Sequence, residues 1–328
     1  MRETLDLLRL LVGISILYWG AEWMIRGSAS LARAFGVKAL VIGLTVVAYG
    51  TSAPELAVST EAAVAHATPI ALGNVIGSCA ANISLILGLT ALIAPPTVDP
   101  RLIRRELPIL LGSAIAVPVV LWDGQITRLE GAILVGCAVL FTIVTLTVSS
   151  RDHMTDEDAA LAHEAEDVGA SYGGRRRPRA SRALALLMSA GGIALLVVGS
   201  DFFVDGARGM AARWGMSERI LGLTLIAVGT SLPELIAGVV AALRGHSSLA
   251  VGSVIGSNLL NVFLVLGVVA YLRPVRVGER MHVVDVVGLV AITLLAVSFL
   301  RGARRISRIE GAVLVLAYVA FLVAAVLL

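Results

Sequence analysis

The sequence contains few charged residues and little cysteine. Asp, Glu, Lys and Arg together make up 15% of its 328 residues, whereas a typical soluble domain has about 25%. The two cysteines, Cys79 and Cys137, lie in apolar segments, and they provide neither a disulfide framework nor the ligand spacing of a metal site. The net charge of +3 reflects arginines between apolar segments, so a nucleic-acid partner is not indicated.

Apolar residues dominate the chain instead. They make up 58% of it, and the mean hydropathy is +0.92. Apolar runs recur from end to end, and a helix needs about 20 apolar residues to cross the hydrocarbon core of a bilayer. We therefore expect an all-α integral membrane protein with ten transmembrane helices, at about 4–25, 39–63, 70–94, 107–122, 130–149, 183–204, 219–243, 249–272, 283–300 and 309–328.

The chain also contains an internal repeat. An offset of 179 residues aligns GLTVVAYGTSAPEL (43–56) with GLTLIAVGTSLPEL (222–235), and GNVIGSCAANISLILG (73–88) with GSVIGSNLLNVFLVLG (252–267). With one extra residue, ITRLEGAIL aligns with ISRIEGAVL. Because each copy has an odd number of helices, matching helices cross the membrane in opposite directions. The sequence thus predicts two inverted five-helix repeats, an architecture common among secondary transporters.

The predicted organisation is a first repeat over 1–149, a linker over 150–182 and a second repeat over 183–328. The linker is acidic in its first part and basic in its second, which is typical of a solvated segment. Lys and Arg are concentrated in the linker and in the other loops on the same predicted side. Because the basic side is cytoplasmic, we expect a multi-pass protein of the plasma (inner) membrane. Its termini would then lie outside and its linker in the cytoplasm.

The strongest motif is a hexapeptide, which reads GTSAPE at 50–55 and GTSLPE at 229–234. Glycine permits a change of backbone direction, proline suits the first turn of a new helix, and the Thr or Ser before it can cap that helix. The second and seventh helices are therefore predicted to be discontinuous. The motif ends in Glu55 and Glu234, and carboxylates inside a membrane are energetically costly and usually functional.

Oxygen-bearing groups gather around these two glutamates in the sequence. The first half-helix ends in unpaired carbonyls, which attract cations, close to Ala48 in one repeat and Ala227 in the other. Hydroxyl, carbonyl and carboxylate oxygens are ligands for hard cations such as Ca²⁺ and Na⁺. A facing wall is predicted from two pairs of polar residues spaced by four, hence on one helical face: Ser78 with Asn82, and Ser257 with Asn261.

Charge balance at this site suggests exchange. Two carboxylates offset the charge of one Ca²⁺, whereas two nearby anions without a cation repel each other in a poorly hydrated site. When Ca²⁺ leaves, the pair is expected to take up protons or sodium ions. The site is then not expected to reorient with two uncompensated charges.

The doubled GTSxPE, each copy followed by GxVIGSxxxN, resembles the repeats of the sodium/calcium exchanger family over nearly the whole chain. The resemblance implies ten transmembrane helices around a central ion site, with the first and sixth helices sliding as a gating pair. It implies Ca²⁺ ligands from Glu55, Glu234, Thr51 and Thr230. It implies Na⁺ ligands from the same glutamates and from Ala48, Ser52, Ser78, Ala227, Ser231 and Ser257, with Asn82 and Asn261 lining the site.

The predicted function is exchange of Ca²⁺ for Na⁺ by alternating access. A Ca²⁺/H⁺ antiporter on the same scaffold is the alternative, because two coupled carboxylates can exchange protons for Ca²⁺. The surrounding serines provide more oxygen sites than proton coupling needs. Asn261 replaces an aspartate found in some family members, which argues against potassium dependence.

An enzyme is not expected, because no midplane His or Asp pair is available to activate a serine. The expected partners are the lipid bilayer and the transported ions. No cofactor and no obligate protein partner is expected.

Overall fold

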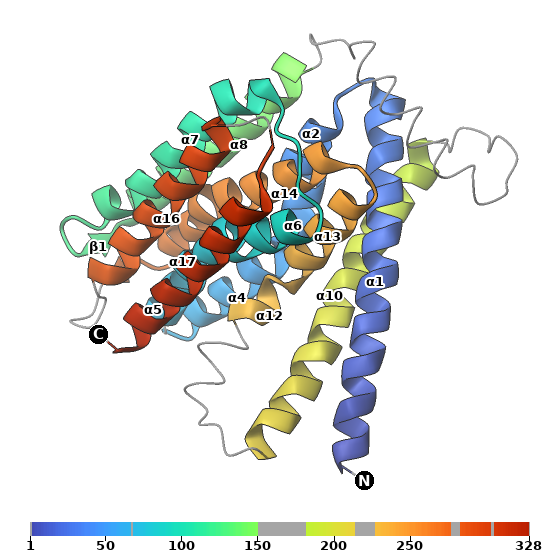
Figure 1. The fold of residues 1–328 in the computed structure, drawn as a ribbon. Coiled ribbons are helices and arrows are strands. Elements are labelled where there is room, and N and C mark those ends of the chain that lie inside the picture. Colours follow the sequence, from blue (N-terminus) through green and yellow to red (C-terminus); the bar gives the residue numbers. More distant parts are fainter. Residues whose placement is uncertain are drawn as a thin grey trace, which may run out of the picture.

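A computed structural model describes residues 2–66, 68–149, 182–213, 227–276, 283–302 and 305–327. Nearly all of these residues are helical (Figure 1). The predicted linker lies outside the described residues except for Arg182, which begins a helix. Residues 214–226, which belong to the seventh predicted segment, also lie outside them.

The first half contains five helical segments, of which three are single continuous helices and two are interrupted. The second segment is divided into four pieces and the third into three, and each contains a π-helical stretch. The elements are α1 (Arg2–Phe35); α2 (Ala39–Ile42), η1 (Gly43–Val47), α3 (Ala48–Thr51) and α4 (Ala53–Val64); α5 (Thr68–Ala80), η2 (Ala81–Ile86) and α6 (Leu87–Ile93); α7 (Pro100–Val120); β1 (Gln125–Ile126); and α8 (Arg128–Ser149).

The second half repeats this order in the part that is described. Its elements are α10 (Arg182–Arg213); α12 (Ala227–Thr230) and α13 (Leu232–Leu243); α14 (Ser247–Leu260), η4 (Asn261–Leu266) and α15 (Gly267–Leu272); β2 (Val275–Arg276); α16 (Val283–Gly302); and α17 (Arg308–Leu327). The helices α1 and α10 are longer than the predicted segments, because both extend past their apolar runs.

The described helices are those of a multi-pass membrane protein. Seven spans are long and apolar enough to cross a bilayer, and an eighth is formed if the bent pair Ala39–Thr51 and Ala53–Val64 counts as one span. Two predicted segments do not enter this count. The helix α7 has four charged residues near its start, and α13 is described without residues 214–226 before it.

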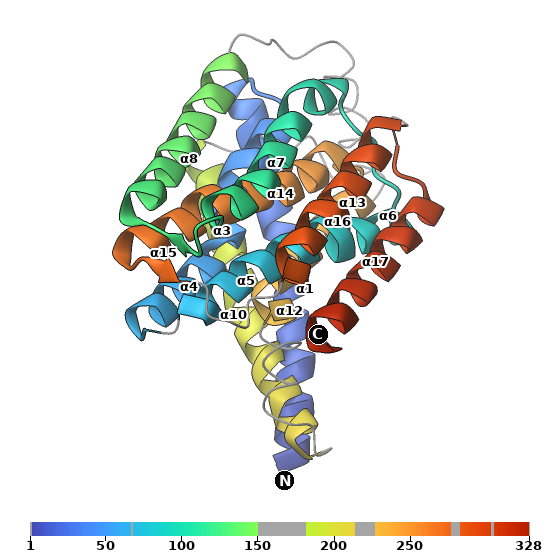
Figure 2. The ribbon, with the colours of Figure 1, turned by 90° about the vertical axis from the view of Figure 1, so that its left-hand side faces the viewer.

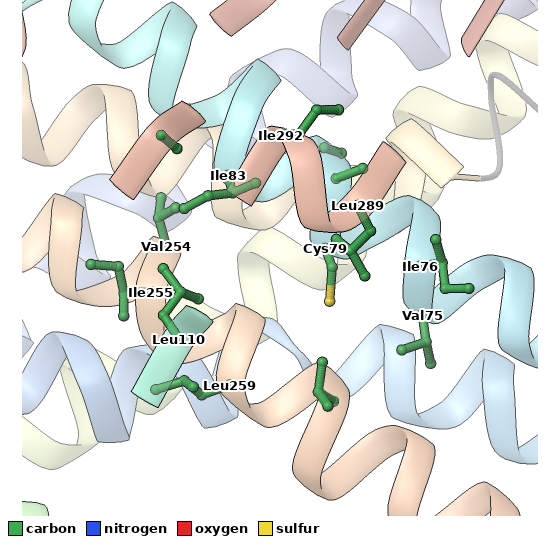
Figure 3. Close-up of a cluster of buried hydrophobic side chains, with 14 of the residues drawn as sticks. Val75, Ile76, Cys79, Ile83, Leu110, Val254, Ile255, Leu259, Leu289 and Ile292 are labelled. Atoms are coloured by element: carbon green, nitrogen blue, oxygen red, sulfur yellow. The ribbon is translucent and has the colours of Figure 1, made fainter. Parts of the chain in front are cut away.

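The centre of the bundle is formed by α5 with η2 and by α14 with η4, which are largely buried. Figure 3 shows their apolar side chains meeting those of α7 and α16, with Ile83, Val254 and Leu289 among the labelled residues. The outer helices α8 and α17 have mostly exposed faces. Because lipid tails are as apolar as leucine, close packing rather than the hydrophobic effect holds such helices together.

The long helices α1 and α10 pack against each other along their length, and their ends extend beyond the rest of the bundle (Figures 1 and 2). Glycines at seven-residue intervals allow this contact: Gly13, Gly20 and Gly27 in α1, and Gly192, Gly199 and Gly206 in α10. A Cβ atom on Gly27 would lie 2.3 Å from the Ser189 backbone nitrogen. The hydroxyls of Ser28 and Ser189 also form a buried hydrogen bond of 3.0 Å.

The two halves interlock through their last helices. The helix α8 of the first half packs on α15, where a Cβ atom on Gly131 would lie 2.7 Å from the Gly267 carbonyl oxygen. The helix α17 of the second half packs on α6, where a Cβ atom on Gly88 would lie 2.8 Å from the Gly311 carbonyl oxygen. Short antiparallel contacts accompany these helices, between β1 and β2 and between Thr97 and Arg305.

The α1–α10 contact provides a test of close packing. We expect Gly192→Ala to lower the free energy of unfolding by about 1–3 kcal/mol through overpacking, because its Cβ atom would lie 2.3 Å from the Met24 nitrogen. The adjacent Gly191→Ala is the control, since its nearest neighbour is the Trp23 side chain at 3.8 Å. Thermal unfolding in detergent measures both, and an equal loss in the two variants would contradict this account.

Candidate functional site

Both copies of the hexapeptide interrupt a helix. The second predicted segment bends by 42° between Thr51 and Ala53, and in the second half α12 and α13 are separated at Ser231. Pro54 and Pro233 lie in the first turns of α4 and α13, as predicted. The discontinuity of the second helix is therefore confirmed. In the seventh predicted segment a break is present at the expected residue, within the part that is described.

The predicted capping of the new helices by serine is wrong. Neither Ser52 nor Ser231 makes a side-chain cap hydrogen bond. The Ser231 hydroxyl instead donates to Glu55 Oε1 at 3.1 Å, across from one half of the chain to the other. The Ser52 hydroxyl is buried and has no partner among the described residues. A hydrogen bond to a charged carboxylate is stronger than one between neutral groups, so the Ser231 hydroxyl is oriented toward the other half of the chain and not toward its own helix.

The two glutamates lie in the first turns of α4 and α13, and both are 0% exposed. Ser231, three residues before Glu234, donates to Glu55 Oε1, so the first turns of the two helices lie beside each other. Ser257 of α14 donates to Glu234 Oε1 at 3.5 Å, and its oxygen lies 3.4 Å from Thr51 Oγ1. Residues from both predicted repeats therefore form one buried polar cluster, and each carboxylate lies at the positive end of a helix dipole.

The predicted facing wall is present on α5 and α14. Ser78, Asn82, Ser257 and Asn261 are all 0% exposed. Two π-helical segments begin beside these residues, η2 at Ala81 and η4 at Asn261. Such π-helical turns occur frequently at functional sites. They were not predicted from the sequence, since a π-helical turn has no distinct hydrophobic period.

Many polar atoms of this cluster have no protein partner. Among the described residues, one carboxylate oxygen of each glutamate, two hydroxyls and both amide groups are buried without a hydrogen bond: Glu55 Oε2, Glu234 Oε2, Ser52 Oγ, Ser78 Oγ, and the Oδ1 and Nδ2 atoms of Asn82 and Asn261. Buried polar groups are nearly always paired, and an unpaired group costs about 1–3 kcal/mol. Their concentration in one place indicates that these atoms serve a ligand.

The chemistry of these atoms narrows the kind of ligand. Carboxylate, hydroxyl and amide oxygens suit hard cations, whereas thiolate and imidazole suit transition metals. No group of three or more His, Cys, Asp and Glu side chains that could hold a metal is found in the described ranges. The arrangement is therefore suited to a hard cation that is held by neutral oxygens and two carboxylates.

The remaining predicted site residues are Ala48, Ala227 and Thr230, which lie on α3 and α12. Ala48 is fully buried at the start of α3, and Thr230 is half-buried at the end of α12. Ala227 begins α12, and its side chain is outside the described set. Glu61 is exposed two turns beyond Glu55 on α4, which makes it a natural control for charge at this helix.

These features define a multi-pass membrane protein with an oxygen-lined site buried among its helices. Residues 5–147 and 184–327 match the family described as sodium/calcium exchanger protein. The match covers both halves and leaves out the segment between them. The chain belongs to the sodium/calcium exchanger family.

Individual relatives agree with this assignment. The chain is 38% identical to CaxA of Alkalimonas amylolytica, provisionally named an antiporter, over 95% of each chain. It is 32% identical to the sodium/calcium exchanger MaX1 of Methanosarcina acetivorans, over 98% of each. The solved structure of the sodium-calcium exchanger NCX_Mj, soaked with 10 mM Na⁺ and zero Ca²⁺, superposes with a TM-score of 0.82. That match is 31% identical and covers 98% of this chain and 99% of the other.

Removal of one buried charge should stabilise the cation-free protein. We expect Glu55→Gln and Glu234→Gln each to raise the free energy of unfolding by about 1–3 kcal/mol in choline buffer with a chelator, because one buried carboxyl fewer must then be protonated or left charged. Glu61→Gln on the same helix is the control, and it should change little. Thermal unfolding measures the three variants, and a destabilisation by either site substitution would contradict the charge argument.

Proposed function

We propose that this protein is a secondary active antiporter that exchanges Ca²⁺ for Na⁺ across the membrane by alternating access. The observation that carries the proposal is the buried pair of glutamates at two helix breaks, surrounded by oxygens without protein partners. Two carboxylates balance one Ca²⁺, and the same oxygens in different combinations suit Na⁺. Because one ion replaces the other, the negative charge of the two glutamates is balanced whenever the site changes the side of the membrane to which it is open.

The calcium ligands in this proposal are Glu55, Glu234, Thr51 and Thr230. The two carboxylate oxygens without hydrogen bonds are available for the ion. The Thr51 hydroxyl is 3.1 Å from the Val47 carbonyl oxygen, to which it donates, so its lone pairs face away from that bond. A bound Ca²⁺ would replace the hydrogen bonds that Ser231 and Ser257 now make to the carboxylates.

The sodium ligands in this proposal are hydroxyl and backbone carbonyl oxygens together with the two glutamates. Ser52 and Ser78 in the first half have hydroxyls without partners among the described residues, whereas Ser231 and Ser257 in the second half bond to a carboxylate. Ala48 and Ala227 would contribute carbonyl oxygens at the ends of the first half-helices. Asn82 and Asn261 would line the site with neutral amides.

Sodium is preferred over protons as the counter-ion because neutral oxygens surround the carboxylates. Proton coupling needs only the two glutamates, whereas four serines and two asparagines with buried polar atoms lie beside them. Relatives named as sodium/calcium exchangers over nearly the full chain support the same choice. No cofactor is required by this mechanism, and the partners are the bilayer and the transported ions.

The proposed architecture is ten transmembrane helices in two inverted repeats, 1–149 and 183–328. Local structure repeats at the predicted offsets: Thr127 and Glu130 form a capping box before α8, and Ser307 and Glu310 form the same one before α17. Cys79 Sγ lies 3.8 Å from the carbonyl oxygen of Asn258, its equivalent at an offset of 179. Equivalent residues meet at a pseudo-twofold axis, so this contact supports such an axis beside the site.

The proposed orientation follows the excess of Lys and Arg on one side. The linker 150–182 would lie in the cytoplasm and both termini outside, in the plasma (inner) membrane. A reporter that is active only in the cytoplasm would then work in the linker and not at either terminus.

Ion flux separates the two candidate counter-ions. In proteoliposomes, we expect Ca²⁺ uptake when an opposing Na⁺ gradient is imposed at equal pH on both sides. A pH gradient imposed without Na⁺ should drive little uptake. Uptake that follows the pH gradient and ignores Na⁺ would instead establish Ca²⁺/H⁺ exchange on the same scaffold.

The paired carboxylates should be indispensable for this transport. Glu55→Gln and Glu234→Gln are each expected to reduce Ca²⁺ flux to background, because one remaining charge no longer balances Ca²⁺. Both variants should elute as folded protein from size-exclusion chromatography in detergent. Glu61→Gln should retain flux. Near-normal flux in either site variant would show that the paired carboxylates are not required for Ca²⁺ transport.

A further inference from the structure

A cluster of ion pairs around one buried carboxylate joins α1 to the end of α13. Arg244, the residue after α13, places its Nη2 and Nε atoms 2.9 and 3.1 Å from Glu22 Oε2. Arg26 Nη2 lies 2.6 Å from the other carboxylate oxygen of Glu22. The Glu22 side chain is 4% exposed, whereas the two arginines are about half exposed. Both oxygens of a buried carboxylate are therefore paired, and arginine–carboxylate pairs of this kind are among the stronger polar contacts in proteins.

The cluster connects two parts of the fold that matter for access to the site. The helix α13 carries Glu234 in its first turn and Arg244 directly after its last residue. The helix α1 packs along α10, and the two form a pair at the edge of the bundle (Figure 1). The Glu22–Arg244 ion pair thus ties this helix pair to the far end of a helix that contributes a site glutamate.

The internal repeat provides a counterpart at the opposite end of the molecule. At the offset of 179, Arg244 corresponds to Ala65, and the structure supports this correspondence. Each residue directly follows a helix that starts at a hexapeptide, and each backbone N–H donates to the carbonyl four residues earlier. The next residues, His66 and Gly245, both have positive φ, at 64° and 77°.

The chemistry of the cluster is not repeated at the counterpart. Glu22 corresponds to Asp201, which keeps the negative charge, but Arg26 corresponds to Asp205 and Arg244 to Ala65. The residues equivalent to the two arginines of the cluster therefore carry no positive charge. The mirror arrangement would hold two acids opposite an alanine.

We propose that the Glu22–Arg244 ion pair is a one-sided latch that favours the state closed to the cytoplasm. The proposal rests on the alternating-access function above, because inverted-repeat transporters change access by moving one bundle against the other. Such a change exchanges equivalent contacts of the two halves, so it separates Glu22 from Arg244 and brings Asp201 toward Ala65. One ion pair is broken, and the residues equivalent to its partners, Asp201 and Ala65, cannot form another.

The latch makes the two access states unequal in population. It does not change the ion stoichiometry or the final gradient, which depend only on the ions exchanged. Removal of a partly exposed ion pair typically changes an equilibrium by up to about fivefold. The Arg244 end lies on the side predicted to be cytoplasmic, so loss of the pair shifts molecules toward the state open to the cytoplasm.

Distance distributions between spin labels test the latch without a flux measurement. The labels replace Leu8 of α1 and Leu129 of α8, which are 56% and 71% exposed, in a background with serine at both natural cysteines. Arg244→Ala and Glu22→Gln are each expected to increase the minor distance component about fivefold relative to the major one. The double charge swap Glu22→Arg with Arg244→Glu should restore part of the original ratio, because the pair between these two positions is re-formed while the pair with Arg26 is not.

The repeat supplies matched controls at the other end. Asp201→Asn should leave the distribution unchanged, since no basic residue corresponds to Arg244 there. Ala65→Arg builds the missing partner and should shift the distribution in the opposite direction. The latch is rejected if Arg244→Ala has no effect, if Asp201→Asn acts like Glu22→Gln, or if Ala65→Arg shifts the populations the same way as Arg244→Ala. Because no transported ion is needed, these outcomes are independent of whether Ca²⁺/Na⁺ exchange is observed.

Discussion

The two buried carboxylates, Glu55 and Glu234, are the constraint on which the rest of the structure depends. A carboxylate in the interior of a membrane bundle is unfavourable unless other groups compensate it. Here each one begins a new helix, so the helix dipole and free backbone N–H groups lie beside it. Neutral oxygens from α5 and α14 complete the surroundings. The helix breaks, the polar central helices and the ion exchange therefore follow from the same need to balance two negative charges.

Close backbone packing is what buries such a polar site among the helices. The glycines of η1 and α14 show this beside the site, where a Cβ atom on Gly43 would lie 2.7 Å from the Leu249 carbonyl oxygen and one on Gly256 would lie 2.7 Å from Ala48 Cβ. Small residues serve the same purpose between α1 and α10, and between the interlocked last helices of the two halves. Because these contacts lie along whole helices, the helices are suited to move as rigid bodies, and ion pairs at their ends can then bias which arrangement is populated.

Much of this could be predicted from the sequence because it depends on local chemistry. Glycine, proline and glutamate in one hexapeptide indicate a helix break with a charge, and the second copy indicates a partner for it. The serines and asparagines of the facing wall follow from their spacing. Other features depend on residues far apart in the chain. The Thr or Ser before each proline was expected to be able to cap the new helix, but Ser231 donates its hydroxyl to Glu55 from the other half and makes no side-chain cap. The π-helical turns at Ala81 and Asn261 likewise have no pattern of their own.

By itself, the sequence determined that this chain is a helical membrane protein, that it is duplicated, and that each copy carries a carboxylate at a helix break. These properties depend on composition and on the conformational limits of single residues. Only the tertiary structure decided that the two glutamates share one cluster, that Ser231 and Ser257 bond to them while the hydroxyls of Ser52 and Ser78 have no partner among the described residues, and that Glu22 is paired with Arg244. Such contacts join residues about 20 to 220 positions apart, and their geometry is set by how whole helices pack rather than by any local preference.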